Sequence, residues 1–295
     1  MKKILKNKKL MITILVIFGL FALGGCASIT GPDGKVLPEK LIALSTPFNA
    51  VFSNEGWFEA FLVYPVAQLI NFLANYIGPV GGLISATVLI NLLTIALSIK
   101  STVGTQKMQM VQPQMQKIQA KYADRKDQES QMKMAKELQD LYAKEGINPF
   151  GSILVTFIQL PIIMVLWQSS QRAISIVQGS FLGFSLETTP LEGFKTGQWF
   201  YVIVFVIMLL VQFASMKIPT YLAKRKNKDV KKSHSVANAP DPNKSMGMMS
   251  NFMIIFIGFI SINWPIAMSI YWIVSSITMI LKTVFIQWKF IDNAK

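Results

Sequence analysis

The sequence predicts an all-α integral membrane protein with five transmembrane helices, an outer interfacial helix and a cytoplasmic helical hairpin. Of its 295 residues, 52% are hydrophobic and only 15% are charged, whereas soluble domains carry about 25% charged residues. Beyond the N-terminal segment, four long runs without charge stand out, at 60–99, 146–171, 196–216 and 245–281. Each run is long enough for a bilayer crossing, which takes about 20 apolar residues.

The composition excludes several function classes. A chain with one Cys and one His cannot form a disulfide framework, a structural zinc site or a Cys–His catalytic pair from these residues alone. The sequence holds no Gly-x-x-x-x-Gly-Lys-Ser/Thr motif for nucleotide phosphates. No nucleophile–base pair is visible either, so we expect neither an enzyme nor a bound cofactor.

The N-terminus is predicted to be a targeting segment. Five lysines within residues 2–9 precede an apolar stretch at 10–23, and this order is typical of a signal peptide. The sequence Leu23-Gly24-Gly25-Cys26 resembles a bacterial lipobox, which implies cleavage before Cys26 and its modification with lipid such as palmitate. We therefore expect a lipoprotein signal peptide at 1–25 and an extracellular lipidated tether at 26–56. The alternative is an ordinary signal anchor with a chance cysteine.

The boundaries of the five-span core, residues 57–287, follow from turn residues and charges. Gly78-Pro79 and Gly81-Gly82 break the first long run without charge, and Asn263-Trp264-Pro265 turns the last one. The expected elements are an outer interfacial helix at 57–77, spans at 80–99, 148–170, 197–216, 246–262 and 265–287, a hairpin at 100–147, a basic cytoplasmic loop at 217–245 and a short cytoplasmic tail at 288–295.

The distribution of basic residues predicts the orientation. Cytoplasmic segments of membrane proteins are enriched in Lys and Arg. With the mature N-terminus outside and the C-terminus inside, 25 of the 29 Lys and Arg residues fall on the cytoplasmic side. We therefore expect a multi-pass protein of the bacterial plasma membrane, with anionic lipid as a partner of the basic cytoplasmic loops.

The segment 100–147 has the pattern of two amphipathic helices. Apolar residues recur at steps of three and four, and Asp124 to Asp127 is the expected turn. Pro113 predicts a kink or a late start in the first helix. Either the hairpin is purely structural, or its flexible Met108, Met115 and Met134 form a docking surface for varied apolar substrates.

Polar residues without charge recur on one face of four of the five spans. A polar face in a span points away from lipid, toward the helix bundle or a water-filled cavity. The alternatives are hydrogen bonds that join the helices and a shared cavity open to the cytoplasm. The residues expected to line it are Thr87, Asn91, Thr94, Ser98, Thr156, Gln159, Gln212, Ser215, Ser269, Trp272 and Ser276.

Three short motifs carry a family resemblance. They are Gly146-Ile147-Asn148-Pro149, Gln159-Leu160-Pro161-Ile162 and Tyr271-Trp272-Ile273-Val274-Ser275. In their order and spacing, the chain resembles the YidC/Oxa/Alb membrane protein insertases, in the lipoprotein form of Gram-positive bacteria. The resemblance implies a hydrophilic groove that takes up polar flanks of nascent membrane proteins and releases their apolar spans into lipid.

The resemblance also implies partners, and the sequence departs from the family pattern at one position. Nascent membrane proteins are the implied substrates, with the Sec translocase and the ribosome as further candidates, and no small molecule is expected. Asn91 stands where the family typically has an arginine, so this groove is expected to be polar but uncharged. The alternatives to insertion are a structural lipoprotein scaffold and a small-solute carrier.

Overall fold

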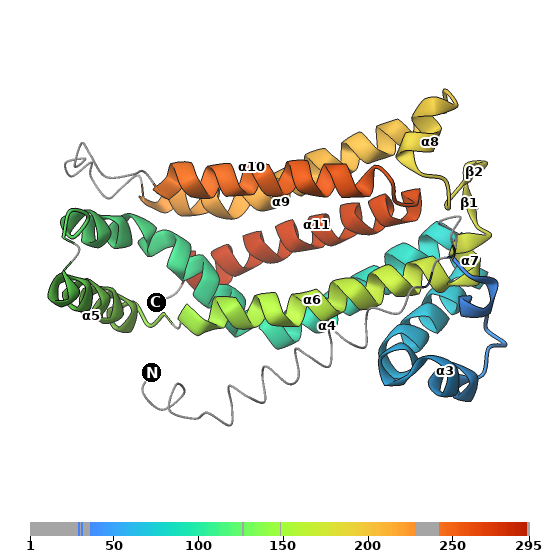
Figure 1. Ribbon diagram of the computed structural model, residues 1–295, viewed down its shortest axis with the longest axis horizontal. Coiled ribbons are helices and arrows are strands. Elements are labelled where there is room, and N and C mark those ends of the chain that lie inside the picture. The colour runs from blue at the N-terminus through green and yellow to red at the C-terminus, as the bar shows by residue number, and fades with distance from the viewer. Residues whose placement is uncertain are drawn as a thin grey trace. The chain divides into compact units, whose positions relative to one another are not determined.

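The computed structural model describes residues 29, 31, 36–125, 127–147, 149–227 and 242–293 (Figure 1). The predicted signal peptide and Cys26 lie outside these residues. The described chain forms two compact units, one from residues up to Thr87 together with 159–188, and one from 88–158 together with residues from Thr189 onward. Each unit is described separately below.

The first unit is built around parts of two long helices. It contains a 3₁₀-helix at Pro38–Lys40, helix α3 (Phe48–Glu55), a π-helix at Glu59–Val63 and the first part of α4 (Tyr64–Lys121). The last part of α6 (Pro149–Arg172), the short α7 (Ile174–Val177) and the antiparallel strands β1 (Ser180–Phe181) and β2 (Phe184–Ser185) complete it.

Helix α4 is interrupted at Gly78. This residue has φ 75° and ψ 167°, a conformation that glycine adopts without the steric cost of a Cβ, and Pro79 follows it without a backbone N–H. The break lies where the Gly-Pro pair predicts it. A late start of the helix at Pro113 is wrong, because α4 continues through Pro113 to Lys121, and a kink there stays a prediction.

Residues 36–56, which are part of the predicted tether at 26–56, have contacts within the first unit. Ile42 is fully buried and forms a parallel bridge with Ala173. The side-chain amide of Asn71 donates a 2.7 Å hydrogen bond to the Ile42 carbonyl, and residues 48–55 form α3. The segment therefore packs on its unit. Its backbone contacts Asn71 of α4 and Ala173, which directly follows α6.

The second unit holds most of the helices. Besides the rest of α4 and the start of α6, it contains α5 (Gln128–Lys144), α8 (Pro190–Lys195), α9 (Trp199–Asn227), α10 (Pro242–Ser261) and α11 (Ile266–Ile286). Helix α9 packs against α8, α10 and α11, and the last two run beside it in Figure 1. A π-helix at Gln287–Asp292 extends α11, so most of the tail expected at 288–295 is helical.

The helical architecture confirms the predicted all-α membrane class. Among the described residues, three helical stretches are long and apolar enough to cross a bilayer: Glu59–Ile95, Trp199–Leu222 and Ile266–Asp292. The spans expected at 148–170 and 246–262 coincide with α6 and α10, whose side chains are only partly described. The arrangement of five spans stays a prediction.

Candidate functional site

Helices α9 and α11 are joined by a polar contact in the middle of both helices. The Ser276 hydroxyl donates a hydrogen bond of 2.5 Å to the side-chain carbonyl oxygen of Gln212. Ser215, one turn further along α9, donates to the backbone carbonyl of Gln212 at 2.8 Å. Ser215 and Ser276 are buried, so these three predicted residues do come together.

Asn91 on α4 contacts the same helix α11. Its side-chain nitrogen donates to the Ser275 hydroxyl oxygen at 3.5 Å, which is long compared with the usual 2.9–3.0 Å of such a bond. The Asn91 amide offers two donors and a carbonyl with two lone pairs. Its long contact with Ser275 is therefore weak and easily exchanged for another partner.

A further contact between α4 and α11 involves residues that the sequence analysis missed. The side-chain nitrogen of the buried Gln106 donates to the backbone carbonyl of the buried Thr283 at 3.1 Å. Gln106 lies fifteen residues after Asn91, which places it on nearly the same face of α4. The predicted polar stripe on α4 ends at Ser98, because the sequence predicts that the span ends at 99. We call the set Asn91, Gln106, Gln212, Ser275, Ser276 and Thr283 the polar seam.

The other residues expected to line a groove fall into three groups. Thr87 and Thr94 donate to carbonyls one turn back in their own helix, at 2.7 and 2.8 Å. The buried Ser269 hydroxyl has no hydrogen-bond partner within the described residues, and Trp272 packs on Trp264 with ring centroids 5.6 Å apart. The side chains of Ser98, Thr156 and Gln159 lie outside the described residues.

The hairpin of α4 and α5 is held by contacts near its turn. Lys121 and Tyr122 both bond the same carboxylate oxygen of Glu137, at 2.6 and 2.8 Å. These two hydrogen bonds hold the pKa of Glu137 below its ordinary value, and the bond from Lys121 has the larger effect. Asp127 caps α5 by accepting from the Ser130 backbone N–H at 2.8 Å.

The methionines of the hairpin differ in exposure. Met108, Met115 and Met134 are half-buried, and the Met115 sulfur accepts a hydrogen bond from the Tyr142 hydroxyl at 3.7 Å. Met132, which the sequence analysis did not single out, is 67% exposed. The three predicted docking residues thus contribute partly to the hairpin's own packing.

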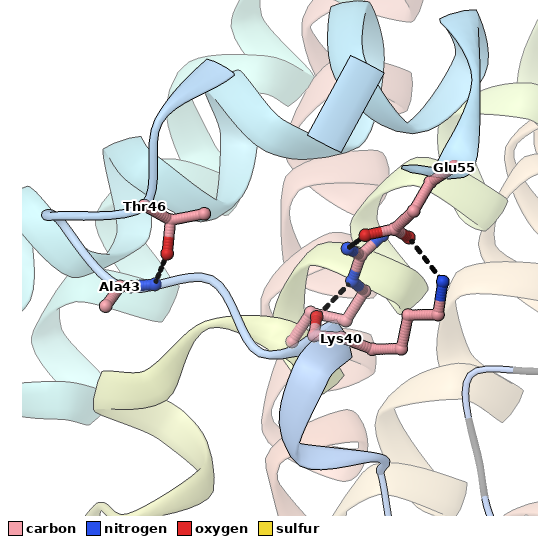
Figure 2. Close-up of polar contacts among 5 residues, drawn as sticks. Lys40, Ala43, Thr46 and Glu55 are labelled. Carbon is pink, nitrogen blue, oxygen red and sulfur yellow. Dashed lines mark hydrogen bonds and ion pairs between the residues drawn. The ribbon is translucent and has the colours of Figure 1, made fainter. Parts of the chain in front are cut away.

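The first unit buries a cluster of formal charges that sequence analysis missed entirely. Arg172 is fully buried, and its guanidinium bonds the Glu55 carboxylate at 2.7 Å and the Lys40 backbone carbonyl at 2.7 Å. Figure 2 shows Glu55 placed so that its second oxygen faces the Lys40 ammonium, 3.6 Å away. Glu59 is buried as well. Burial lowers the pKa of Arg172 while Glu55 opposes that shift, and an arginine in such a pair stays charged.

The described residues contain no group of three His, Cys, Asp or Glu side chains able to hold a metal ion. The seam itself consists of neutral amides and hydroxyls. What it offers chemically is a set of hydrogen-bond donors and acceptors between three helices, without a charge or a nucleophile.

Comparison with known proteins adds a family assignment. The family described as 60Kd inner membrane protein matches residues 72–293. The chain is 30% identical over 292 residues to Membrane protein insertase YidC 2 of Bacillus anthracis, which covers 98% of this chain and 97% of that protein. It is 30% identical to Membrane protein insertase MisCA of Bacillus subtilis over 94% of this chain and 90% of that protein. Membrane protein insertase YidC of Oceanobacillus iheyensis is 28% identical over 95% of this chain and 97% of that protein.

Proposed function

The chain belongs to the YidC/Oxa/Alb family of membrane protein insertases, and from this premise we propose how it inserts nascent membrane proteins into the bilayer. Insertion of this kind is not an enzymatic reaction. The family assignment over residues 72–293 is the observation that carries the function, and it favours insertion over a scaffold or a solute carrier.

The proposed step is the uptake of a short polar flank of the substrate into a hydrophilic groove open to the cytoplasm. A backbone group without a hydrogen-bond partner in hydrocarbon costs several kcal/mol. A groove lined by Asn91, Gln212 and Trp272 would supply exchangeable partners and shorten the apolar part of the path. Burial of the substrate's own apolar span then drives its release into lipid, and no nucleotide is needed.

Two observations support exchangeable hydrogen bonds, one in the seam and one at Ser269, which lies on the same helix α11 outside the seam. The contact of Asn91 with Ser275 is 3.5 Å long, so little is lost when another group replaces Ser275. The buried Ser269 hydroxyl has no partner among the described residues, and such a group costs about 1–3 kcal/mol until water or a ligand satisfies it. Because the seam is neutral, we propose that acidic substrate flanks enter by hydration rather than by attraction to an arginine.

We further propose five spans with the mature N-terminus outside, the C-terminus inside and Cys26 lipidated. The Cys26→Ser protein should lose radiolabelled palmitate and retain its signal peptide. Incorporation of palmitate into the Cys26→Ser protein would contradict the lipid anchor but leave the insertase function intact.

The hairpin of α4 and α5 is the proposed first contact for substrates. Anionic lipid is the proposed partner of the basic segment 217–245, whose ends belong to α9 and α10, and the Sec translocase and the ribosome are further proposed partners. Deleting about 105–140 should leave the spans inserted and impair substrate capture. Full complementation by this deletion would show that the hairpin is dispensable.

Depletion of the protein followed by membrane proteomics tests the function most directly. We expect loss of small proteins with one or two spans, and rescue by the wild type but not by Asn91→Leu. A membrane proteome unchanged on depletion, with no second insertase present in the strain, would overturn the proposal.

A further inference from the structure

Helix α4 and the segment 174–179 border a pocket in the first unit, next to the break at Gly78. Its volume is about 340 Å³, at the lower end of the range of about 300–1,000 Å³ for small-molecule pockets. Nine residues line it, and all of them belong to the first unit. The four polar ones are Asn71, Asn75, Ser175 and Gln178. We call this space the amide pocket.

The walls of the amide pocket are set by contacts within the chain. The side-chain nitrogen of Asn71 donates to the Ile42 carbonyl at 2.7 Å, and its side-chain oxygen accepts from the Ser175 backbone N–H at 3.1 Å. Gly179 packs so closely on Pro79 that a Cβ at this glycine would lie 2.8 Å from the Pro79 Cβ. Carbon atoms that are not bonded normally stay about 3.5–4.0 Å apart. The pocket is therefore formed before any ligand binds.

Three polar side chains of the pocket have no hydrogen-bond partner within the part of the chain that the structure describes. The Ser175 hydroxyl is buried and unpaired, although most buried polar groups find a partner. Asn75 and Gln178 are exposed, and neither side-chain amide bonds another described residue. Each amide offers two donors and a carbonyl oxygen. The pocket thus presents unused donors and acceptors from α4 and from the segment 174–179.

The lining residues favour an uncharged ligand. None of the nine is Asp, Glu, Lys, Arg or His, so no lining side chain can pair with the charge of a phosphate or an ammonium group, as a bound charge requires. Leu44, Pro79 and Ile174 supply an apolar part of the wall. A sugar ring fits this combination, because it carries hydroxyls on its edge and C–H groups on its faces. Each hydroxyl both donates and accepts hydrogen bonds, as a side-chain amide does.

From this lining we propose that the amide pocket binds an uncharged sugar, carried as the head group of a membrane lipid. Phe72 and Tyr76 each follow a pocket residue by one position on α4, and both are exposed, with ring centroids 5.2 Å apart. They belong to the candidate membrane span Glu59–Ile95. The acyl chains of a lipid can therefore pack beside these rings while its sugar occupies the pocket. None of the pocket residues belongs to the polar seam, so this role goes beyond the proposed insertion.

Native mass spectrometry of the purified full chain in detergent tests the binding. The two probes are digalactosyl diacylglycerol and diacylglycerol with the same acyl chains, at equal concentration. We expect adducts with the glycolipid and several-fold fewer with diacylglycerol. Asn75→Leu and Gln178→Leu should each weaken glycolipid binding about three- to tenfold, the effect of losing one neutral hydrogen bond.

Asn49→Leu is the matched control, because Asn49 is an exposed amide on α3 of the same unit and does not line the pocket. It should bind the glycolipid as the wild type does. The free disaccharide melibiose tests the source of the sugar and should bind more weakly than the glycolipid. Equal binding of melibiose would overturn the assignment to a lipid head group and leave the sugar site standing.

Three results would overturn the sugar site itself. The first is equal binding of glycolipid and diacylglycerol, and the second is glycolipid binding that neither Asn75→Leu nor Gln178→Leu weakens. The third is a protein adduct instead of a lipid adduct when p-benzoylphenylalanine replaces Asn75 in cells, since a polypeptide would then occupy the pocket.

Discussion

The two units bury polar groups in opposite ways. In the first unit, Arg172 and Glu55 carry full charges, and a contact of 2.7 Å pairs them out of water. In the polar seam of the second unit the groups are neutral, and the half-buried Asn91 amide meets Ser275 only at 3.5 Å. The first unit pairs charges at short distance, whereas the seam pairs neutral groups, through one short bond between Ser276 and Gln212 at 2.5 Å and one long contact at Asn91.

The difference separates a holding contact from an exchangeable one. A buried charge without its partner is so unfavourable that the pair stays closed under ordinary conditions. Neutral side-chain bonds between membrane helices are worth about 0.6 kcal/mol on average, so they open readily. We infer that the charged cluster fixes the N-terminal segment, whereas the seam is suited to trade partners with a passing polypeptide.

The largest effect is expected at Arg172. Arg172→Met leaves the Glu55 carboxylate buried without its main partner, which costs roughly 3–5 kcal/mol. We expect a clear drop in the thermal unfolding temperature in detergent and rapid proteolysis within residues 36–56. The double variant with Glu55→Gln should recover part of the stability.

The exposed Lys195 provides the matched control. Lys195→Met removes one positive charge without uncovering a buried acid, so unfolding should stay close to wild type. If Arg172→Met and Lys195→Met were equally stable, the buried ion pair would contribute no measurable stability. The proposed distinction between the charged cluster and the polar seam would then fail.

Asn91 should show the opposite behaviour, with loss of function and little loss of stability. Asn91→Leu removes the donor to Ser275 and leaves an apolar side chain in the proposed groove. We expect the protein to accumulate normally and to fail in complementation of a depleted strain. Asn91→Arg should be tolerated if water fills the groove, because the charge is then hydrated.

A chemical readout separates a groove from a packed interface. Asn91→Cys, in a Cys26→Ser background, should react with a membrane-impermeant maleimide in inverted membrane vesicles. Absence of this labelling, together with failure of Asn91→Arg to accumulate, would mean that Asn91 is packed between helices. The hydrogen bonds of the seam would then be fixed structural contacts, like the ion pair of the charged cluster.

Sequence alone predicts local features of this fold better than long-range ones. The break at Gly78 is predictable because a Gly-Pro pair is a local signal. Helical spacing places Gln212 and Ser276 on polar faces, but it cannot say that these faces meet, because the pairing depends on how α9 packs on α11. Arg172 and Glu55 are 117 residues apart, and no local pattern connects them.

Ser276 tests the bond between α9 and α11 with a smaller effect. Ser276→Ala removes the donor to Gln212 and should cost about 0.6–2 kcal/mol, the range for side-chain bonds between membrane helices. Thr278→Val, two residues along the same helix, is the control because the Thr278 hydroxyl bonds a carbonyl within α11. If the two variants unfold alike in detergent, the contact with Gln212 adds no stability beyond an intrahelical bond.

The smallest effect is expected at the exposed ion pair of the hairpin, which adds a third kind of polar contact to the comparison. Lys121 and Tyr122 hold the pKa of Glu137 below its ordinary value, so the folded hairpin favours the ionised carboxylate. The stabilisation is fully present above the pKa of an unfolded glutamate, about 4.3, and is lost as the pH falls through the lower pKa of the folded state.

Glu137→Gln should therefore speed amide hydrogen exchange slightly in α5 of the full chain at neutral pH. After correction for the intrinsic pH dependence of exchange, the difference from wild type should vanish in acid. Glu129→Gln is the control, since Glu129 pairs with Lys133 at 2.7 Å within the same exposed helix and makes no bond across the hairpin. A difference between Glu137→Gln and wild type that persists in acid would mean that Glu137 acts by packing rather than by charge. Salt should weaken the Glu137 effect, because exposed ion pairs are screened, whereas salt should leave the Arg172–Glu55 pair nearly unchanged, because both side chains are largely out of water.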